Sequence, residues 1–243
     1  MAKTRIYDAL ENAGQMPAIG GEPFRPDKVS AAAPGLRVER KMIALYQSIC
    51  ALTPAEAGRS VQLVSAHPRE GTSRIARGLA CAAGIKLGKK VALIDADAGQ
   101  SGQASAFGVR VIHGLDEAID GERPIKEVLV GAAGGRLSIG QLTAASAVAP
   151  TIFNMPATGA FLDSLKQQYE LVVIDSPPVG VAPEALGLCD KVDGVVLVVQ
   201  AERTRREVVE NVRDNIVQRG GRVLGVVLNR RRYYIPKFIY DRI

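Results

Sequence analysis

Short apolar runs alternate along the chain with longer segments in which apolar residues recur every three or four positions. Unbroken runs are typical of parallel strands buried on both faces, and the longer period is typical of helices with one buried face. Strands are predicted within 61–64, 89–100, 137–142, 169–180, 194–200 and 222–229, and helices within 38–52, 74–88, 114–129, 151–168 and 207–218. The repeated order of strand and helix predicts an α/β fold with a doubly wound, mainly parallel sheet.

The stretch around the first strand has the layout of a phosphate-binding loop. A strand (VQLV) is followed by a turn that contains Pro68 and Gly71, and then by a helix. In this layout, backbone N–H groups and the positive end of the helix face an anion. Gly71 and Ser73 match the usual signature G-x-x-x-x-G-K-[ST], whereas Ala66 and Thr72 replace its first glycine and its lysine. Alone, this partial match favours an ordinary strand–turn–helix connection.

Carboxylates follow two further predicted strands and change that balance. Asp95 and Asp97 end the strand in KKVALIDADAGQ, and Asp175 ends the strand in YELVVIDSPPVG. Ligands of open α/β sheets bind beyond the carboxyl ends of the strands. Mg²⁺ prefers oxygen ligands and is held by one or two carboxylates together with phosphates and water. A nucleotide–magnesium site is therefore predicted where the glycine loop and these acids follow three strands. A single Asp in such a place is more often a turn former or a helix cap.

The segments HPREGTS, LIDAD and VVIDSPP resemble those of the bacterial polysaccharide-biosynthesis tyrosine autokinases (CpsD/CapB-like BY-kinases), relatives of the MinD/ParA ATPases. The resemblance covers nearly the whole chain and implies a P-loop, MinD-like fold that binds ATP or ADP with Mg²⁺. It implies that the nucleotide contacts Pro68, Arg69, Glu70, Gly71, Thr72, Ser73, Arg74 and, at the adenine edge, Asn229. It also implies Mg²⁺ ligation by Ser73, Asp95 and Asp175, and catalytic roles for Asp95 and Asp97. A catalytic role for Arg69 is predicted from its place on the loop.

The departures from that family bear on activity. Thr72 offers one neutral hydrogen bond where the family has a cation, and charge-assisted bonds are about twice as strong as neutral ones. Arg69, Arg74 and Arg77 are the nearby substitutes, and Arg69 lies on the loop itself. We therefore expect weak or partner-dependent phosphoryl transfer in exopolysaccharide or capsule biosynthesis or export. The alternatives are a catalytically inactive, nucleotide-responsive scaffold and a MinD/ParA-like positioning ATPase.

Composition places the chain in a reducing compartment. Its 243 residues hold three scattered cysteines and two histidines without metal-ligand spacing. No apolar run is long enough to span a membrane, and no signal peptide is recognisable, so we expect a cytoplasmic protein, peripheral at most to the inner face of the cell membrane. The net charge is +6, and the segment 203–243 alone carries eleven basic and four acidic residues. This excess favours an anionic partner for that segment.

The predicted organisation has three parts: a flexible arm with a short helix (1–36), a nucleotide-binding domain (37–232) and a basic, aromatic tail (233–243). The tail is interpreted first as a packing or docking segment, second as contacting an anionic membrane surface, and third as a short phosphoacceptor; nucleic acid is not favoured, because no recognition motif accompanies the charge. By resemblance, the partner is the cytoplasmic segment of a membrane polysaccharide co-polymerase (Wzz-like). Glu39 matches the family's ring-forming E-x-x-R-x-x-R motif, but Met42 and Leu45 replace its arginines, which disfavours such a ring and leaves a looser homo-oligomer open.

Overall fold

The computed structural model describes residues 33–53, 58–98, 102–143 and 152–231. The predicted helix of the N-terminal arm, its linker up to residue 32, and the tail 233–243 lie outside the described residues. Within them, no helix is both long and apolar enough to cross a membrane.

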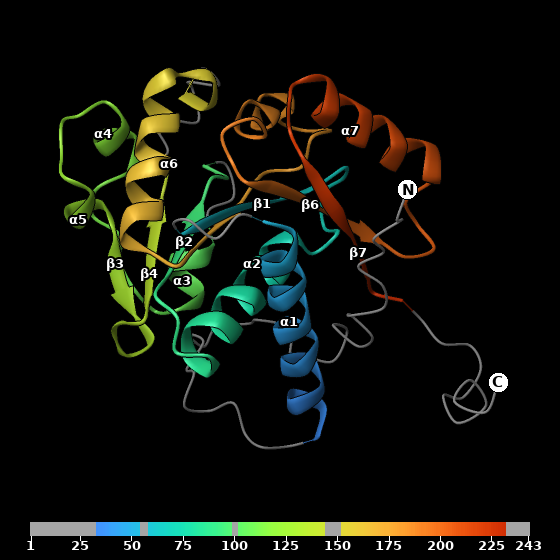
Figure 1. The fold of residues 1–243 in the computed structure, drawn as a ribbon, viewed down its shortest axis with the longest axis horizontal. Coiled ribbons are helices and arrows are strands. Elements are labelled where there is room, and N and C mark those ends of the chain that lie inside the picture. The colour runs from blue at the N-terminus through green and yellow to red at the C-terminus, as the bar shows by residue number, and fades with distance from the viewer. Residues whose placement is uncertain (1–32, 54–57, 99–101, 144–151, 232–243) are drawn as a thin grey trace.

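Seven strands form one sheet in the order β3-β4-β2-β5-β1-β6-β7 (Figure 1). They are β1 (Arg59–Ser65), β2 (Val91–Asp95), β3 (Val130–Ala132), β4 (Leu137–Gln141), β5 (Leu171–Asp175), β6 (Gly194–Gln200) and β7 (Val223–Asn229). All neighbouring strands are parallel except the edge pair β3–β4, which is antiparallel. The predicted mainly parallel sheet is confirmed, and the six predicted strands are present. The short edge strand β3 was not predicted.

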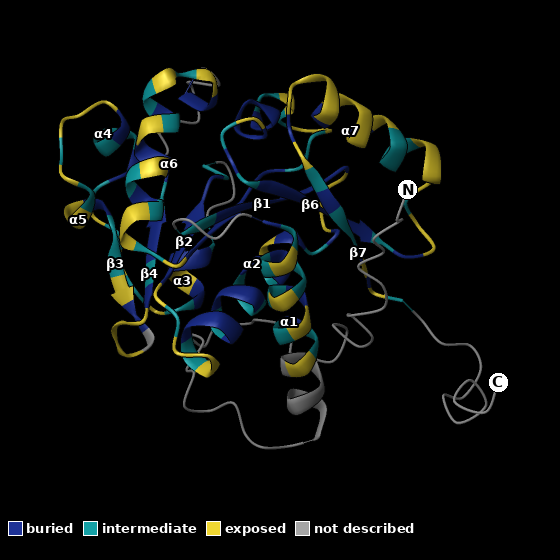
Figure 2. Ribbon diagram, viewed as in Figure 1, coloured by how far each residue is buried: buried dark blue, intermediate teal, exposed yellow. Residues whose placement is uncertain are grey.

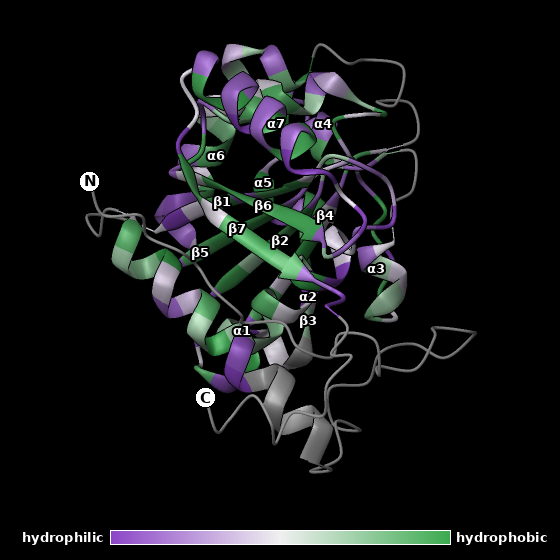
Figure 3. Ribbon diagram, turned by 90° about the vertical axis from the view of Figure 1, so that its right-hand side faces the viewer, coloured by the Kyte–Doolittle hydropathy of each residue, from purple (hydrophilic) through white to green (hydrophobic). Residues whose placement is uncertain are grey.

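Helices cover both faces of this sheet, as expected of a doubly wound fold. They are α1 (Ala33–Leu52), α2 (Thr72–Cys81), α3 (Gln103–Ala106), α4 (Leu115–Ile119), α5 (Ile125–Val128), α6 (Pro156–Gln168) and α7 (Arg206–Gln218). Single helical turns of other types are η3 (Ala82–Lys86), η4 (Ala133–Gly135), η6 (Ile152–Asn154) and η7 (Pro183–Leu188). In the turned view, α1 and α2 lie on one side of the sheet, and α4, α6 and α7 lie on the other (Figure 3). The helix expected within 114–129 is two short helices, and α3 and η7 were not predicted.

In the part of the chain that the structure describes, two apolar clusters, one on each face of the sheet, form the core. The strands between them are mostly buried (Figure 2). Successive residues of a strand point to opposite faces, so Leu63 of β1 joins the cluster under α1 and α2, whereas Val64 joins the cluster under α6 and α7. Met42, Leu45 and Ile49 of α1 are buried at helical spacing, as the pattern predicts. The two places of the family's ring-forming arginines therefore belong to the core of this chain.

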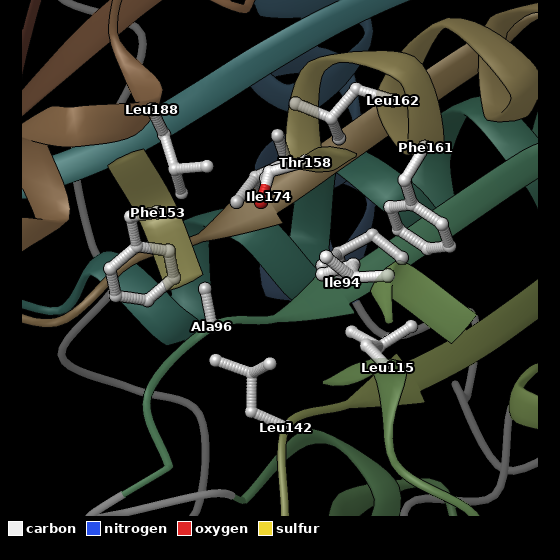
Figure 4. A pocket seen from close by; sticks show the side chains of 11 residues that line it. Ile94, Ala96, Leu115, Leu142, Phe153, Thr158, Phe161, Leu162, Ile174 and Leu188 are labelled. Atoms are coloured by element: carbon white, nitrogen blue, oxygen red, sulfur yellow. The ribbon is translucent and has the colours of Figure 1, made fainter. Parts of the chain in front are cut away.

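A small apolar cavity lies between the sheet and α6 (Figure 4). Ile94, Ile174, Phe161 and Leu162 contribute to its lining, and its volume is about 20 Å³. The hydroxyl of Thr158, which also lines it, already donates a hydrogen bond to the carbonyl of Ile152. A space of this size holds at most about one water molecule, and a water needs polar partners. The cavity is therefore a packing gap in the core and not a ligand site.

Candidate functional site

The structure brings the three predicted strand ends together, because β5 lies between β1 and β2 in the sheet. Asp175 is in register with Asp95 of β2 and with Leu63 of β1. The loop after β1 leads into α2, whose first turn contains Ser73. The predicted convergence of a loop and two acidic strand ends at one edge is thus observed.

The loop between β1 and α2 presents part of its sequence to solvent. His67, Pro68 and Arg69 are exposed, and so is Ser73 at the start of α2. Arg69 has a left-handed backbone (φ 67°), which is uncommon for a residue other than glycine. Such strained residues gather at functional sites when surrounding contacts hold them in place. The loop is therefore an exposed turn held in a specific conformation at the positive end of a helix.

Glu70, predicted to contact the nucleotide, has its side chain turned inward. Its side chain is buried, and its carboxylate accepts hydrogen bonds from the backbone N–H of His67 at 2.8 Å and of Gln200 at 3.2 Å. The hydroxyl of Thr204 donates to the same carboxylate. The side chain thus faces inward because these donors satisfy its charge there. Glu70 fastens the loop to the segment after β6 and does not present its carboxylate to a nucleotide.

Asn229, predicted to contact adenine, forms a hydrogen bond with the loop between β1 and α2. It is buried at the end of β7, and its side-chain amide donates to the carbonyl of Glu70 at 2.7 Å. Its side-chain oxygen accepts from the backbone N–H of Arg230 at 2.9 Å. In this structure Asn229 therefore anchors the loop, and its contact with adenine stays a prediction.

Thr72, at the place of the missing lysine, does not offer its hydroxyl to a phosphate. It is the first residue of α2 and is only 7% exposed. Its Oγ1 atom is buried and has no hydrogen-bond partner among the described residues. The hydrogen bond from the Thr72 hydroxyl to the nucleotide stays a prediction, since this hydroxyl is buried in the present conformation. The backbone N–H group of Thr72, at the start of α2, is the other group that can contact a phosphate.

Replacing Gly71 with alanine is expected to destabilise the protein and to weaken any ligand binding at the loop. Gly71 has a left-handed φ of 97°, and a Cβ atom there would collide with the side-chain nitrogen of Asn229. That nitrogen is held by Glu70, so it cannot move without loss of the loop anchor. Thermal unfolding measures the loss. Gly88→Ala is the matched control, since Gly88 is also left-handed (φ 68°) but has open space around it. Equal losses in both variants would show that the contact with Asn229 does not matter.

The carboxyl of Asp175 is the most perturbed acid at this edge. It is 2% exposed. Burial, and then the nearby charge of Asp95, raise its pKa to about 7, whereas hydrogen bonds from Gln103 and Ser73 act to lower the pKa. Gln103 donates to Oδ2 of Asp175 at 2.7 Å. The other oxygen, Oδ1, is buried and has no hydrogen-bond partner among the described residues. A buried carboxylate oxygen in this state is a ready ligand for a cation or for water bound to one.

Asp95 has a visible structural role beside Asp175. It is 1% exposed, and its Oδ2 atom accepts from the backbone N–H groups of Gly102 and Gln103, at 2.9 and 3.0 Å. Its Oδ1 atom accepts from Asp97 N at 3.2 Å. Asp95 thus holds the start of α3. A helix cap is the structural role that the sequence offered as the alternative to metal binding. A carboxylate has about four acceptor positions, so a share in a metal site remains open to it. Asp97 is half-buried and lies two residues beyond the strand.

Gln103 and Arg77 complete the surroundings of the acids, and sequence reasoning missed the first of them. Gln103 is fully buried and links α3 to Asp175, to the Ser73 carbonyl and to Arg77. Burial lowers the pKa of the Arg77 guanidinium, whereas the charges of Asp175 and Asp95 raise it. Arg77 therefore faces the acidic pair from α2. The only signal for Gln103 in the sequence is one amide in a segment of small residues.

Arginines gather on the other side of the loop. Burial, and then the like charges of Arg230 and Arg77, lower the pKa of Arg74. Arg230 follows the loop anchor Asn229 and has a left-handed φ of 57°. Together with exposed Arg69, these side chains place positive charge near a loop that lacks its lysine. Arg230 was not among the predicted site residues, although its neighbour Asn229 was.

The residues present fit Mg²⁺. The free Oδ1 of Asp175, the neighbouring carboxylate of Asp95 and the exposed hydroxyl of Ser73 are oxygen donors, which this hard cation prefers. The described residues contain no group of three or more His, Cys, Asp or Glu side chains suited to hold a metal by themselves. The remaining ligands of an ion would therefore be phosphate and water oxygens, as is usual for Mg²⁺ in phosphate-binding sites.

Comparison with known proteins finds relatives of this chain in sequence and in fold. No protein-family model matches the chain. The chain is 27% identical to the tyrosine-protein kinase CpsD of Streptococcus agalactiae over 169 aligned residues. These residues are 69% of this chain and 73% of CpsD. The chain is 26% identical over 178 residues to the tyrosine-protein kinase YwqD of Bacillus subtilis, spanning 72% and 73% of the two chains. In sequence the chain is therefore CpsD/CapB-like: it is similar to these bacterial tyrosine-protein kinases.

Several solved structures share the fold. The chimerical protein CapA2B2 superimposes with a TM-score of 0.72 at 24% identity, covering 89% of this chain and 95% of that one. The kinase domain of VpsO gives a TM-score of 0.65 at 26% identity, covering 80% and 98%. Cobyrinic acid a,c-diamide synthase from Mycobacterium smegmatis, solved with an ATP analogue and magnesium, gives 0.57 at 19% identity, over 70% and 72%. The last similarity extends the fold to the MinD/ParA-related P-loop proteins.

Proposed function

We propose that the chain is a magnesium-dependent ATP-binding member of this kinase family that transfers phosphate weakly or only with a partner. The observation that carries the proposal is the meeting of the β1 loop with Asp95 and Asp175 at one sheet edge, where Oδ1 of Asp175 has no hydrogen-bond partner among the described residues. A buried carboxylate pair is costly unless a cation joins it. A nucleotide-bound Mg²⁺ ion supplies that charge and would neutralise the charge that develops on phosphate oxygens.

The chain's own residues then divide the work of binding. The backbone N–H groups of the loop and of the first turn of α2 would bind the phosphates, because they lie at the positive end of a helix. Ser73, Asp95 and Asp175 would hold the ion. Asp97 is less buried than Asp95, so it is the carboxylate we assign to accept the proton of an attacking hydroxyl. Glu70 and Asn229 act indirectly, by fastening the loop.

The expected weakness of transfer follows from the charge around the phosphates. Thr72 supplies no cation, and its hydroxyl is buried. Arg69 is exposed on the loop, and Arg74 lies in the first turn of α2 with Arg230 near it. Guanidinium groups bind phosphate oxygens well but approach from other directions than the lysine would. We propose that Arg69 and Arg74 recover part of the missing stabilisation.

An inactive, nucleotide-responsive scaffold is the second candidate function. It is favoured by one observation, the buried hydroxyl of Thr72 at the place of the lysine. Such a protein would bind ATP or ADP without transferring phosphate. The segment after β6 would respond to the nucleotide, because Glu70 connects the loop to Gln200 and Thr204.

The setting that fits both candidates is exopolysaccharide or capsule biosynthesis, with a Wzz-like membrane co-polymerase as partner. Its support is the family itself and the likeness to CapA2B2, which is named as a chimerical protein. We propose a cytoplasmic protein that reaches the inner face of the membrane through this partner or through its basic tail. The tyrosines 233, 234 and 240, which belong to the tail, lie outside the described residues.

The test is calorimetry with ATP and ADP, in Mg²⁺ and in EDTA, followed by phosphotyrosine detection on the same samples. We expect Mg²⁺-dependent binding that Ser73→Ala weakens about tenfold or more, since one metal ligand is lost. Ser164→Ala, at a half-buried serine of α6 away from the loop, is the matched control. Absence of Mg²⁺-dependent binding at millimolar nucleotide would overturn the proposal. Binding without any phosphotyrosine, with or without the partner segment, would favour the scaffold.

A further inference from the structure

Gln103 is a fully buried polar residue to which the proposed function assigns no task. It is the first residue of α3, and its side chain reaches toward α2 and β5. Its Nε2 atom donates to Oδ2 of Asp175 at 2.7 Å and to the carbonyl of Ser73 at 2.9 Å. Its Oε1 atom accepts from Nε of Arg77 at 3.0 Å. One amide therefore contacts both elements that would hold the metal.

The orientation of this amide is fixed by its neighbours. Arg77 can only donate, and the carbonyl of Ser73 can only accept. A flipped amide would place Nε2 against the Arg77 donor and Oε1 against the carbonyl and the Asp175 carboxylate. Three attractive contacts would then become three repulsive ones, so the network itself assigns oxygen and nitrogen. Arg77 thus forces the donor end of Gln103 toward Asp175.

We propose that Gln103 is the positioning residue of the magnesium site, holding Asp175 by Oδ2 so that Oδ1 stays available to the ion or to its water. This inference rests on the proposed function. The same amide also holds the Ser73 carbonyl, so it sets the spacing between the hydroxyl and carboxylate ligands. Partners of this kind, one step behind the ligands, orient metal ligands and tune metal affinity.

The neutrality of the amide matters as much as its geometry. A lysine or arginine bonded to Asp175 would orient it but would also cancel the negative charge that attracts the cation. Gln103 donates two hydrogen bonds without carrying a charge, and it keeps the Arg77 guanidinium one residue away from Oδ2. The carboxylate therefore keeps its charge for Mg²⁺ while its rotation is restricted.

The test is a Mg²⁺ titration of ADP binding in Gln103→Met, which has similar length, lacks the amide and keeps the backbone bond to Asp95. We expect the apparent Mg²⁺ constant to weaken about 10- to 100-fold. ADP affinity in EDTA should change much less than the Mg²⁺ constant, because Gln103 contacts the phosphate-binding segment only at the Ser73 carbonyl. Gln62→Met is the matched control: Gln62 is also fully buried, but its amide donates to Ser176 and to the Ala185 carbonyl.

The outcomes separate this inference from the function on which it rests. A wild type without Mg²⁺-dependent binding would overturn the proposed function and the inference with it. A wild type that requires Mg²⁺, beside a Gln103→Met variant with the same Mg²⁺ constant, would overturn the inference alone. A tighter constant in Gln103→Met would also overturn it, by showing that the amide blocks the ion. If the variant does not fold, Gln103→Asn, which is polar but too short to keep all three contacts, must show the same weakening.

Discussion

Asp175→Asn is expected to raise the thermal stability of the nucleotide-free protein while abolishing Mg²⁺-dependent nucleotide binding. The carboxyl is buried in register with Asp95, and burial followed by that charge raises its pKa from 3.8 to about 7. For an acid, a raised pKa in the folded state means that folding favours the protonated form. The stability this provides is complete below pH 3.8 and is lost as the pH rises through 7. Above neutral pH the ionised carboxylate therefore destabilises the fold.

Asparagine removes this charge with little change of shape, and its side-chain oxygen can still accept from Gln103. At pH 8 we expect a gain on the order of a few kcal/mol, since each unit of pKa shift corresponds to about 1.4 kcal/mol. The gain should shrink at pH 5, where the wild-type carboxyl is largely protonated. Thermal unfolding at both pH values measures it, with Asp163→Asn as the control for an exposed carboxylate. A variant less stable than wild type at pH 8 would show that the fold satisfies the charge.

The arrangement of strands and long helices followed from the hydrophobic pattern, because burial on one or two faces dictates that pattern. The β5 and β6 runs and the buried stripe of α1 are of this kind. The short elements were missed because they hold too few residues to show such a pattern. β3 has three residues including Gly131, and α3 has four, mostly small, so neither carries a readable period.

The site was predictable where chemistry sits at strand ends and unpredictable where it depends on distant contacts. The positions of Asp95, Asp175 and Ser73 follow from the order of strands alone. The direction of Glu70 depends on Thr204, 134 residues away, and that of Asn229 depends on the loop 159 residues before it. No local pattern records such pairs, so the sequence did not show that the side chains of Glu70 and Asn229 also hold the loop.

Thr72→Lys is expected to raise phosphoryl transfer about a thousandfold, which corresponds to about 4 kcal/mol of transition-state stabilisation. Thr72 begins α2 beside the proposed phosphate site, and its buried hydroxyl has no hydrogen-bond partner among the described residues. Its replacement therefore breaks no hydrogen bond of the described part. Lysine has a flexible four-carbon stem, so its ammonium can reach the phosphates even from a buried Cβ. The added charge lies near Arg74 and Arg230, whose repulsion a bound nucleotide would relieve.

Thr72→Val separates the effect of the charge from that of the lost hydroxyl. Valine has the shape of threonine without the unpartnered polar atom, so we expect wild-type turnover and equal or higher stability. Phosphotyrosine formation and ATP hydrolysis are measured for wild type, Thr72→Lys, Thr72→Val and Arg69→Ala. Fast wild-type turnover that Arg69→Ala leaves unchanged would show that another residue supplies the charge. If wild type and Thr72→Lys both bind nucleotide and neither turns over, the missing lysine is not the limiting defect and the scaffold function accounts for the chain.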